Sequence, residues 1–154
     1  MQSIVDSAIP ATVSTTAATS PAARLALAPH RAEQAVLDGG WWPRTWNAAE
    51  ELPALVTALA QRYGPIRHLM LNETVWPDHV RRLTVGSQAV RIGWFATQDP
   101  ALAIALTARD EQLDLLVVPP STPTAAAERA LATAADPADF THAADILAAL
   151  PPQA

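Results

Sequence analysis

The chain has 154 residues, half of them hydrophobic, which fits one domain of ordinary size with one sizeable core. Its ten basic residues, all arginine, face fifteen acidic ones, so the formal net charge is -5. This acidic balance argues against a nucleic-acid partner, because such binding depends on clustered basic side chains that neutralise phosphates. The chain has no cysteine, which excludes disulfides, thiolate nucleophiles and cysteine-based metal sites.

The sequence has no apolar run long enough to span a membrane and no amino-terminal pattern typical of a secretory signal. We therefore expect a cytoplasmic protein without a membrane partner. Residues 1–21 are rich in Ser, Thr and Ala and show no apolar period, which is typical of a disordered tail. The expected organisation is this tail, a single α+β domain over residues 22–150 and a disordered end over residues 151–154.

The first expected elements are two short strands and a helix. The segments 24–28 and 34–37 are short apolar runs, and the second ends at Asp38-Gly39-Gly40, which is typical of a tight turn. Asn47 is a good helix N-cap, and Glu50 stands three residues later, as in a capping box. Apolar residues at helical spacing then predict a helix that ends at Tyr63-Gly64-Pro65.

From residue 66 the apolar period becomes that of strands. Five strand-length segments follow at residues 66–71, 82–85, 90–95, 102–107 and 113–118. Their short connections indicate an antiparallel meander, and two helices follow at about residues 125–135 and 138–150. We predict an α+β fold, in which a curved antiparallel sheet of about 6–7 strands packs on one central helix and two C-terminal helices.

The segment Gly39-Gly40-Trp41-Trp42-Pro43-Arg44-Thr45-Trp46 places three of the five tryptophans within six positions. It is either a pocket rim, where indoles stack on a flat ligand and Arg44 binds its carboxylate or phosphate, or a packed junction with Arg44 stacked on indole. In an extended segment Trp41 and Trp42 point to opposite sides, so we expect one buried and one accessible indole. Asp38 either serves the turn or pairs with Arg44. The predicted ligand-binding residues are Trp41, Trp42, Arg44, Trp46 and Asp38.

Residues 72–79 hold the densest mixture of acidic, basic and aromatic side chains. Either a carboxylate tunes the imidazole of His79 for acid–base work, or these are ordinary groups of an exposed loop. The secondary candidate cluster is Glu73, Trp76, Asp78 and His79. An enzyme would have to gather Arg44, Glu73, His79 and Asp99 from separate loops, although Asp99 before a proline is also typical of a turn.

Four arginines, Arg67, Arg81, Arg82 and Arg91, lie in or beside predicted strands. They form either surface salt bridges or, if their strands adjoin, a local site for an anion. Strand alternation places Arg67 and His68 on opposite faces. The sequence contains no metal-ligand spacing, nucleophile elbow or glycine-rich phosphate loop, so we expect no metal and no cofactor.

Several motifs occur together in one order: Asp38-Gly39-Gly40-Trp41-Trp42-Pro43-Arg44, Arg91-Ile92-Gly93, residues 97–100, and Leu115-Leu116-Val117-Val118-Pro119-Pro120. The chain resembles, over about residues 24–135, an actinobacterial family of small proteins of unknown function that carries DGxWWPR and LLVVPP motifs. The resemblance implies a soluble actinobacterial protein, and it supplies no activity, ligand or residue role.

The sequence therefore favours a non-enzymatic binding or regulatory module that uses the Trp/Arg surface to hold a protein or a small anionic ligand. The alternative is a small enzyme with a loop-built acid/base pocket. The ligand or partner and the oligomeric state are not readable from these residues.

Overall fold

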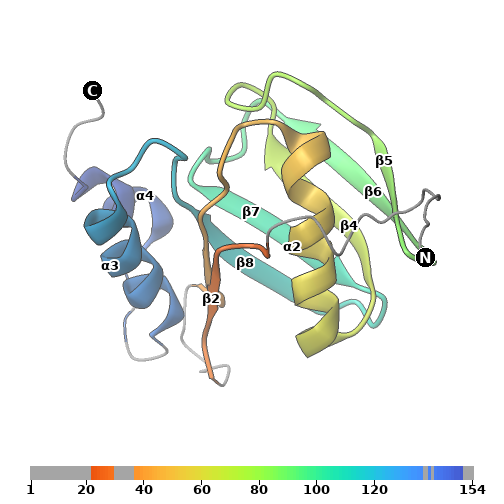
Figure 1. The fold of residues 1–154 in the computed structure, drawn as a ribbon, viewed down its shortest axis with the longest axis horizontal. Helices are drawn as coiled ribbons and strands as arrows, with labels where there is room; N and C mark the ends of the chain where they lie inside the picture. The colour runs from red at the N-terminus through yellow and green to blue at the C-terminus, as the bar shows by residue number, and fades with distance from the viewer. Residues whose placement is uncertain (1–21, 30–36, 137–138, 140, 151–154) are drawn as a thin grey trace, which may run out of the picture.

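The computed structural model describes residues 22–29, 37–136, 139 and 141–150. These residues form an α+β fold, as predicted, with three helices and one sheet of seven strands in the order β2-β3-β8-β7-β4-β6-β5 (Figure 1). The strands are β2 (Leu25–Leu27), β3 (Gly39–Trp41), β4 (Ile66–Asn72), β5 (Arg82–Val85), β6 (Gln88–Phe95), β7 (Leu102–Thr107) and β8 (Gln112–Val117). The helices are α2 (Ala48–Tyr63), α3 (Thr124–Ala135) and α4 (Ala143–Ala148).

The sheet is mostly antiparallel, but β3 pairs with β8 and β4 pairs with β6 in parallel. The hairpins β5–β6 and β7–β8 confirm the short antiparallel connections expected from the sequence. The predicted meander is wrong, because β4 lies between β7 and β6 instead of beside β5. The connection over residues 73–81 carries the chain past β6 to the edge of the sheet.

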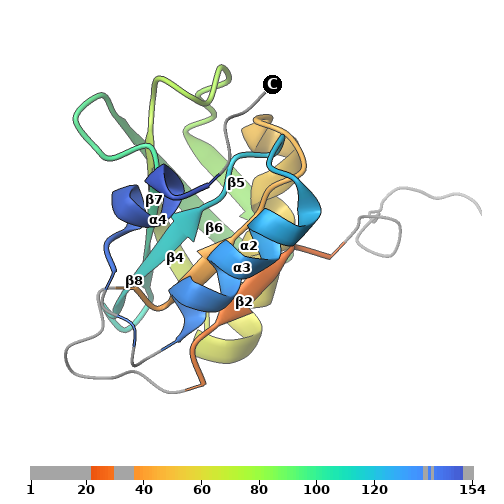
Figure 2. The same ribbon diagram turned by 90° about the vertical axis from the view of Figure 1, so that its left-hand side faces the viewer.

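The helices cover the two faces of the sheet unequally. Helix α2 buries its apolar stripe, Leu52, Leu55, Val56 and Leu59, against one face. Helices α3 and α4 pack on the opposite face at the end formed by β2, β3 and β8 (Figure 1, Figure 2). Among the described elements none covers that opposite face over β6 and β5, whose side chains there are exposed. We call this region the open face.

The pair Gly39-Gly40 forms strand β3 and not the predicted turn. A Cβ atom on Gly39 would lie 2.3 Å from the carbonyl oxygen of Ala26 on β2. On Gly40 it would lie 2.9 Å from Cδ2 of Leu131 on α3. Both glycines therefore allow a neighbouring element, β2 or α3, to approach the backbone of β3 closely. Glycine serves this purpose as well as it serves a turn. The strand expected over residues 34–37 falls mostly outside the described residues.

The last helix is shorter than predicted, since α4 begins at Ala143. Ahead of it the carboxylate of Asp139 accepts hydrogen bonds from the backbone N–H and the hydroxyl of Thr141, at 3.0 and 2.6 Å. Such local bonds from Asp and Thr compete with helical backbone bonds.

The N-cap predicted at Asn47 is confirmed, because Oδ1 of Asn47 accepts a hydrogen bond of 3.3 Å from the backbone N–H of Glu50. The capping box is not formed, because the backbone N–H of Asn47 donates to Oγ1 of Thr45 at 3.1 Å instead of to the Glu50 side chain. Asn47→Ala removes the Oδ1 acceptor and should lower the free energy of unfolding by about 1 kcal/mol. Asn47→Asp keeps an acceptor and should stay close to the wild type. Urea unfolding followed by circular dichroism measures both variants, and no loss in Asn47→Ala, or an equal loss in the two, would contradict a stabilising role of the Asn47 acceptor.

Candidate functional site

Both indoles at the centre of the tryptophan motif are buried. Trp41 is 1% exposed and belongs to the core under α2, whereas Trp42 is 8% exposed and belongs to the core under α3 and α4. The alternation that sends them to opposite faces is therefore confirmed. The expectation that one indole is accessible is wrong, because helices cover both faces of the sheet at β3.

Trp41 is part of a stack that reaches a distant loop. Its ring stacks on that of Trp76, with centroids 5.5 Å apart and planes at 11°, and Trp46 meets Trp76 edge-on at 4.9 Å. We call these three residues the tryptophan cluster. Trp76, which we expected within a polar cluster, is 1% exposed and belongs to the core.

The second indole, Trp42, lies against an arginine that the sequence did not single out. The guanidinium of Arg24 lies 3.6 Å from the ring centroid and donates to the carbonyl oxygens of Trp42 and Pro43, both at 2.9 Å. The sequence predicts Arg44 in this role, which is wrong. Arg44 is exposed and donates to the carbonyl oxygen of Ala22 at 2.8 Å. No local pattern around Arg24 marks it as the partner, since the contact joins segments eighteen positions apart.

Asp38 is buried, and its carboxylate accepts a hydrogen bond of 2.8 Å from the backbone N–H of Asp114 on β8. It therefore ties the start of β3 to the neighbouring strand. Together these contacts make the motif a packed junction. Ligand binding by Trp41, Trp42, Arg44, Trp46 and Asp38 stays a prediction that their burial and hydrogen bonds do not favour.

The loop after β4 also uses its polar groups structurally. Nε2 of His79 lies 2.7 Å from the carbonyl oxygen of Glu73, and its ring packs on Trp94 with centroids 4.9 Å apart. The side chains of Glu73 and Asp78 are exposed. Asp99 accepts a bond of 2.9 Å from the backbone N–H of Ala101, as a turn residue does. The carboxylate of Asp99 and the imidazole of His79 thus bond to nearby backbone groups.

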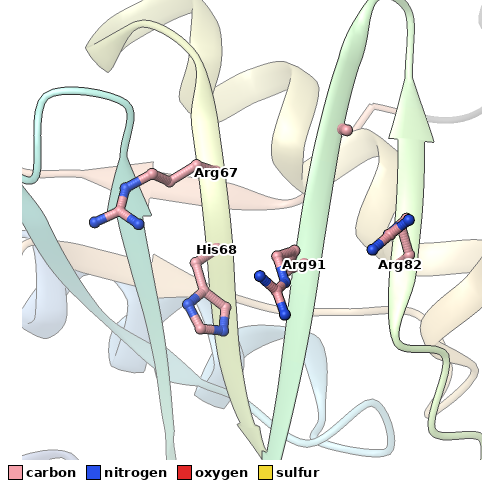
Figure 3. A pocket seen from close by; sticks show the side chains of 5 residues that line it. Arg67, His68, Arg82 and Arg91 are labelled. Atoms are coloured by element: carbon pink, nitrogen blue, oxygen red, sulfur yellow. The ribbon is translucent and has the colours of Figure 1, made fainter.

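Three basic side chains form one cross-strand row that runs from β4 onto the open face. His68 on β4 stands opposite Arg91 on β6, and Arg91 stands opposite Arg82 on β5. Figure 3 shows the Arg91 side chain between those of His68 and Arg82. We call these three residues the basic row. Side chains directly opposite in a sheet have Cβ atoms about 5 Å apart, and like charges at that distance destabilise the pairing.

A fourth basic side chain, Arg67, reaches the same cavity through a β-bulge. The pairing of β4 with β7 shifts register between Ile66 and His68, which leaves Arg67 as an extra residue. The prediction that Arg67 and His68 lie on opposite faces is therefore wrong. Arg67 forms an ion pair with Asp110 and donates to the carbonyl oxygen of Thr107 at 3.2 Å.

The row itself lacks such a counter-charge. Within the described part of the chain, no acidic side chain forms an ion pair with Arg82 or Arg91. The residues of the row, with Arg67 and Ala89, line a cavity of about 330 Å³. Partial burial, and then the charges of Arg91 and Arg67, lower the pKa of His68 below its ordinary value. The cavity therefore presents the guanidinium groups of Arg82 and Arg91, beside the ion-paired Arg67 and an imidazole that favours its neutral form.

Part of the basic row could be predicted from the sequence. The two-residue turn Gly86-Ser87 fixes the hairpin register, which places Arg82 opposite Arg91. The position of His68 depends on the parallel pairing of β4 with β6, for which the sequence has no local signal. Arg81, the remaining arginine of the expected stripe, precedes β5, and its carbonyl oxygen accepts from the backbone N–H of Ile92.

A family model described as "Family of unknown function (DUF5994)" matches residues 24–134. The chain belongs to this family. The matched span contains every described strand and almost all of α3, so it includes the tryptophan cluster and the basic row. Comparison with curated proteins and with solved structures gave no match. None of the helices in the described segments has the length and apolarity needed to cross a membrane.

Because the tryptophan cluster lies in the core, Trp76→Ala should lower the free energy of unfolding by about 3–5 kcal/mol. The matched control is Phe95→Ala, which truncates an aromatic side chain that is 45% exposed and should cost about 1 kcal/mol or less. Urea unfolding followed by far-ultraviolet circular dichroism measures both variants. Similar small losses in the two would contradict a structural role for the stack.

The lowered pKa of His68 makes stability depend on pH. Below the ordinary histidine pKa of about 6.5, the unfolded chain binds a proton at His68 that the folded chain resists, so the free energy of unfolding falls as the pH drops through this range. His68→Asn should lose less stability than the wild type between about pH 7.5 and about pH 5.5. The urea midpoints of both proteins, measured against pH in buffers free of sulfate and phosphate, test this difference. The same pH dependence in His68→Asn and the wild type would contradict it.

Proposed function

We propose that the protein is a non-enzymatic binding module that holds a small anionic ligand on the open face of its sheet, at the basic row. The observation that carries this proposal is the opposition of Arg82, Arg91 and His68 across three adjacent strands without an acidic partner in the described segments. Like charges placed this way cost stability, and a bound anion would remove that cost.

The chemistry of the row suits one compact oxyanion. Guanidinium groups present planar sets of N–H donors that match the oxygen spacing of carboxylate, sulfate or phosphate. Arg82 and Arg91 stand directly opposite each other, so both guanidinium groups could bind the same anion. A bound negative charge would also favour the protonated form of His68, which would then donate a third hydrogen bond.

A small ligand fits better than an extended polyanion. The basic side chains gather at one cavity of about 330 Å³, while the chain as a whole carries a net charge of -5. Long-range repulsion from the rest of the protein would oppose a polyanion more than a single charged group. The proposed function is thus the non-enzymatic binding module that the sequence favoured. We propose its site on the open face and not at the tryptophan motif.

Sulfate is a suitable first probe, because its charge does not change near neutral pH. Arg91→Gln should weaken sulfate binding about tenfold or more, since it removes charge-assisted hydrogen bonds to the anion. The matched control, Arg129→Gln, removes an exposed guanidinium on α3 and should bind as the wild type does. Isothermal titration calorimetry at low ionic strength measures the three affinities.

The same variants separate binding from simple misfolding. Without sulfate, Arg91→Gln should be as stable as the wild type or slightly more stable, because it relieves the repulsion from Arg82. Equal sulfate affinity in Arg91→Gln and the wild type, or no binding of sulfate to the folded wild type, would disprove the proposed site.

A further inference from the structure

An exposed aromatic ring adjoins the basic row on the open face. Phe95 is 45% exposed, and among the described residues no other large hydrophobic side chain is classed as exposed. Residues two apart in a strand share a face, so Phe95 on β6 lies on the same side of the sheet as Arg91. An aromatic ring left in water on an open sheet is a recurring platform for flat ligands.

The ring of Phe95 lies back along β6 toward the row. A Cβ atom on Gly93 would lie 2.8 Å from Cε2 and 3.1 Å from Cζ of Phe95, and 3.4 Å from Nε2 of His68. The ring therefore lies above Gly93, close to the imidazole. Because Gly93 has no side chain, the ring can lie flat against the backbone of β6, next to His68 of the basic row.

The spacing suits one small molecule. Gly93, under the ring, and Arg91 are two residues apart, which is about 7 Å along a strand. Beside Gly93, toward β4 and β7, the same side of the sheet carries apolar side chains: Met70 on β4 stands opposite Gly93, and Ile104 on β7 stands opposite Met70. Charge and apolar surface thus lie next to each other, so the face fits a ligand with one anionic and one flat apolar end.

We propose that the ligand is an aromatic phosphate of mononucleotide size, with its phosphate on Arg82 and Arg91 and its ring stacked on Phe95. This inference rests on the proposed anion site and adds the class of ligand. Two guanidinium groups and a protonatable imidazole match the double charge of a phosphate monoester better than the single charge of a carboxylate. One exposed ring beside one basic row provides for one base, whereas proteins that bind single strands present a basic groove with successive aromatic platforms.

Three probes separate the two ends of the site: adenosine 5′-monophosphate, ribose 5-phosphate and inorganic phosphate. In the wild type, adenosine monophosphate should bind about fivefold or more tightly than ribose 5-phosphate, because a base stacked on an aromatic side chain adds that much affinity. Phe95→Leu keeps apolar volume without an aromatic face, so it should abolish this difference while ribose 5-phosphate and inorganic phosphate bind as before. Phe95→Tyr keeps the platform and should preserve the difference.

Calorimetric titration of each probe decides between the two proposals. If adenosine monophosphate and ribose 5-phosphate bind equally and Phe95→Leu changes neither, the anion site stands and the aromatic-phosphate inference is overturned. If none of the three probes binds to the folded wild type, the proposed anion site itself fails. If an oligoadenylate binds more than about tenfold tighter than adenosine monophosphate, with a steep salt dependence, the ligand is a single strand and the inference is overturned in favour of it.

Discussion

Strand β3 is buried on both of its faces, and the rest of the structure depends on this constraint. Gly39 allows β2 to approach on one edge, and Gly40 allows α3 to approach on one face. Trp41 and Trp42 then fill the two opposite cores. The alanines that α3 buries let that helix lie close to the sheet. Because α3 and α4 are committed to this end, the described helices leave β6 and β5 open on the same face.

Local chemistry allowed part of the fold to be predicted from the sequence. The cap at Asn47 and the helical apolar spacing mark α2, and Gly86-Ser87 marks the β5–β6 hairpin, because these features depend on neighbouring residues. The position of β4 beside β6 depends instead on the pairing of two strands that are not consecutive in the chain. Such non-local choices leave no signal in one strand, so the meander was a reasonable and wrong expectation.

The same distinction separates the predictable part of the site from the rest. The arginines were visible as residues, and the hairpin turn sets Arg82 opposite Arg91. The bulge at Arg67 and the parallel neighbour that brings in His68 are features of tertiary pairing. For the tryptophan motif the sequence predicted an accessible surface that the structure does not have. Its aromatic and arginine content suits a binding surface, but only the packing of α3 and α4 reveals that Trp42 is covered.

An anion bound at the basic row, as we propose, would change the protonation of His68. His68 favours its neutral form because of partial burial and two nearby guanidinium groups, which lower its pKa. An imidazole acting as a general base must stay neutral while the substrate is bound. An anionic substrate at this row would instead raise the pKa of His68 and draw in a proton, which removes the base at the moment it is needed. If an anion binds here as we propose, this coupling of anion and proton would strengthen its retention and oppose its deprotonation by His68.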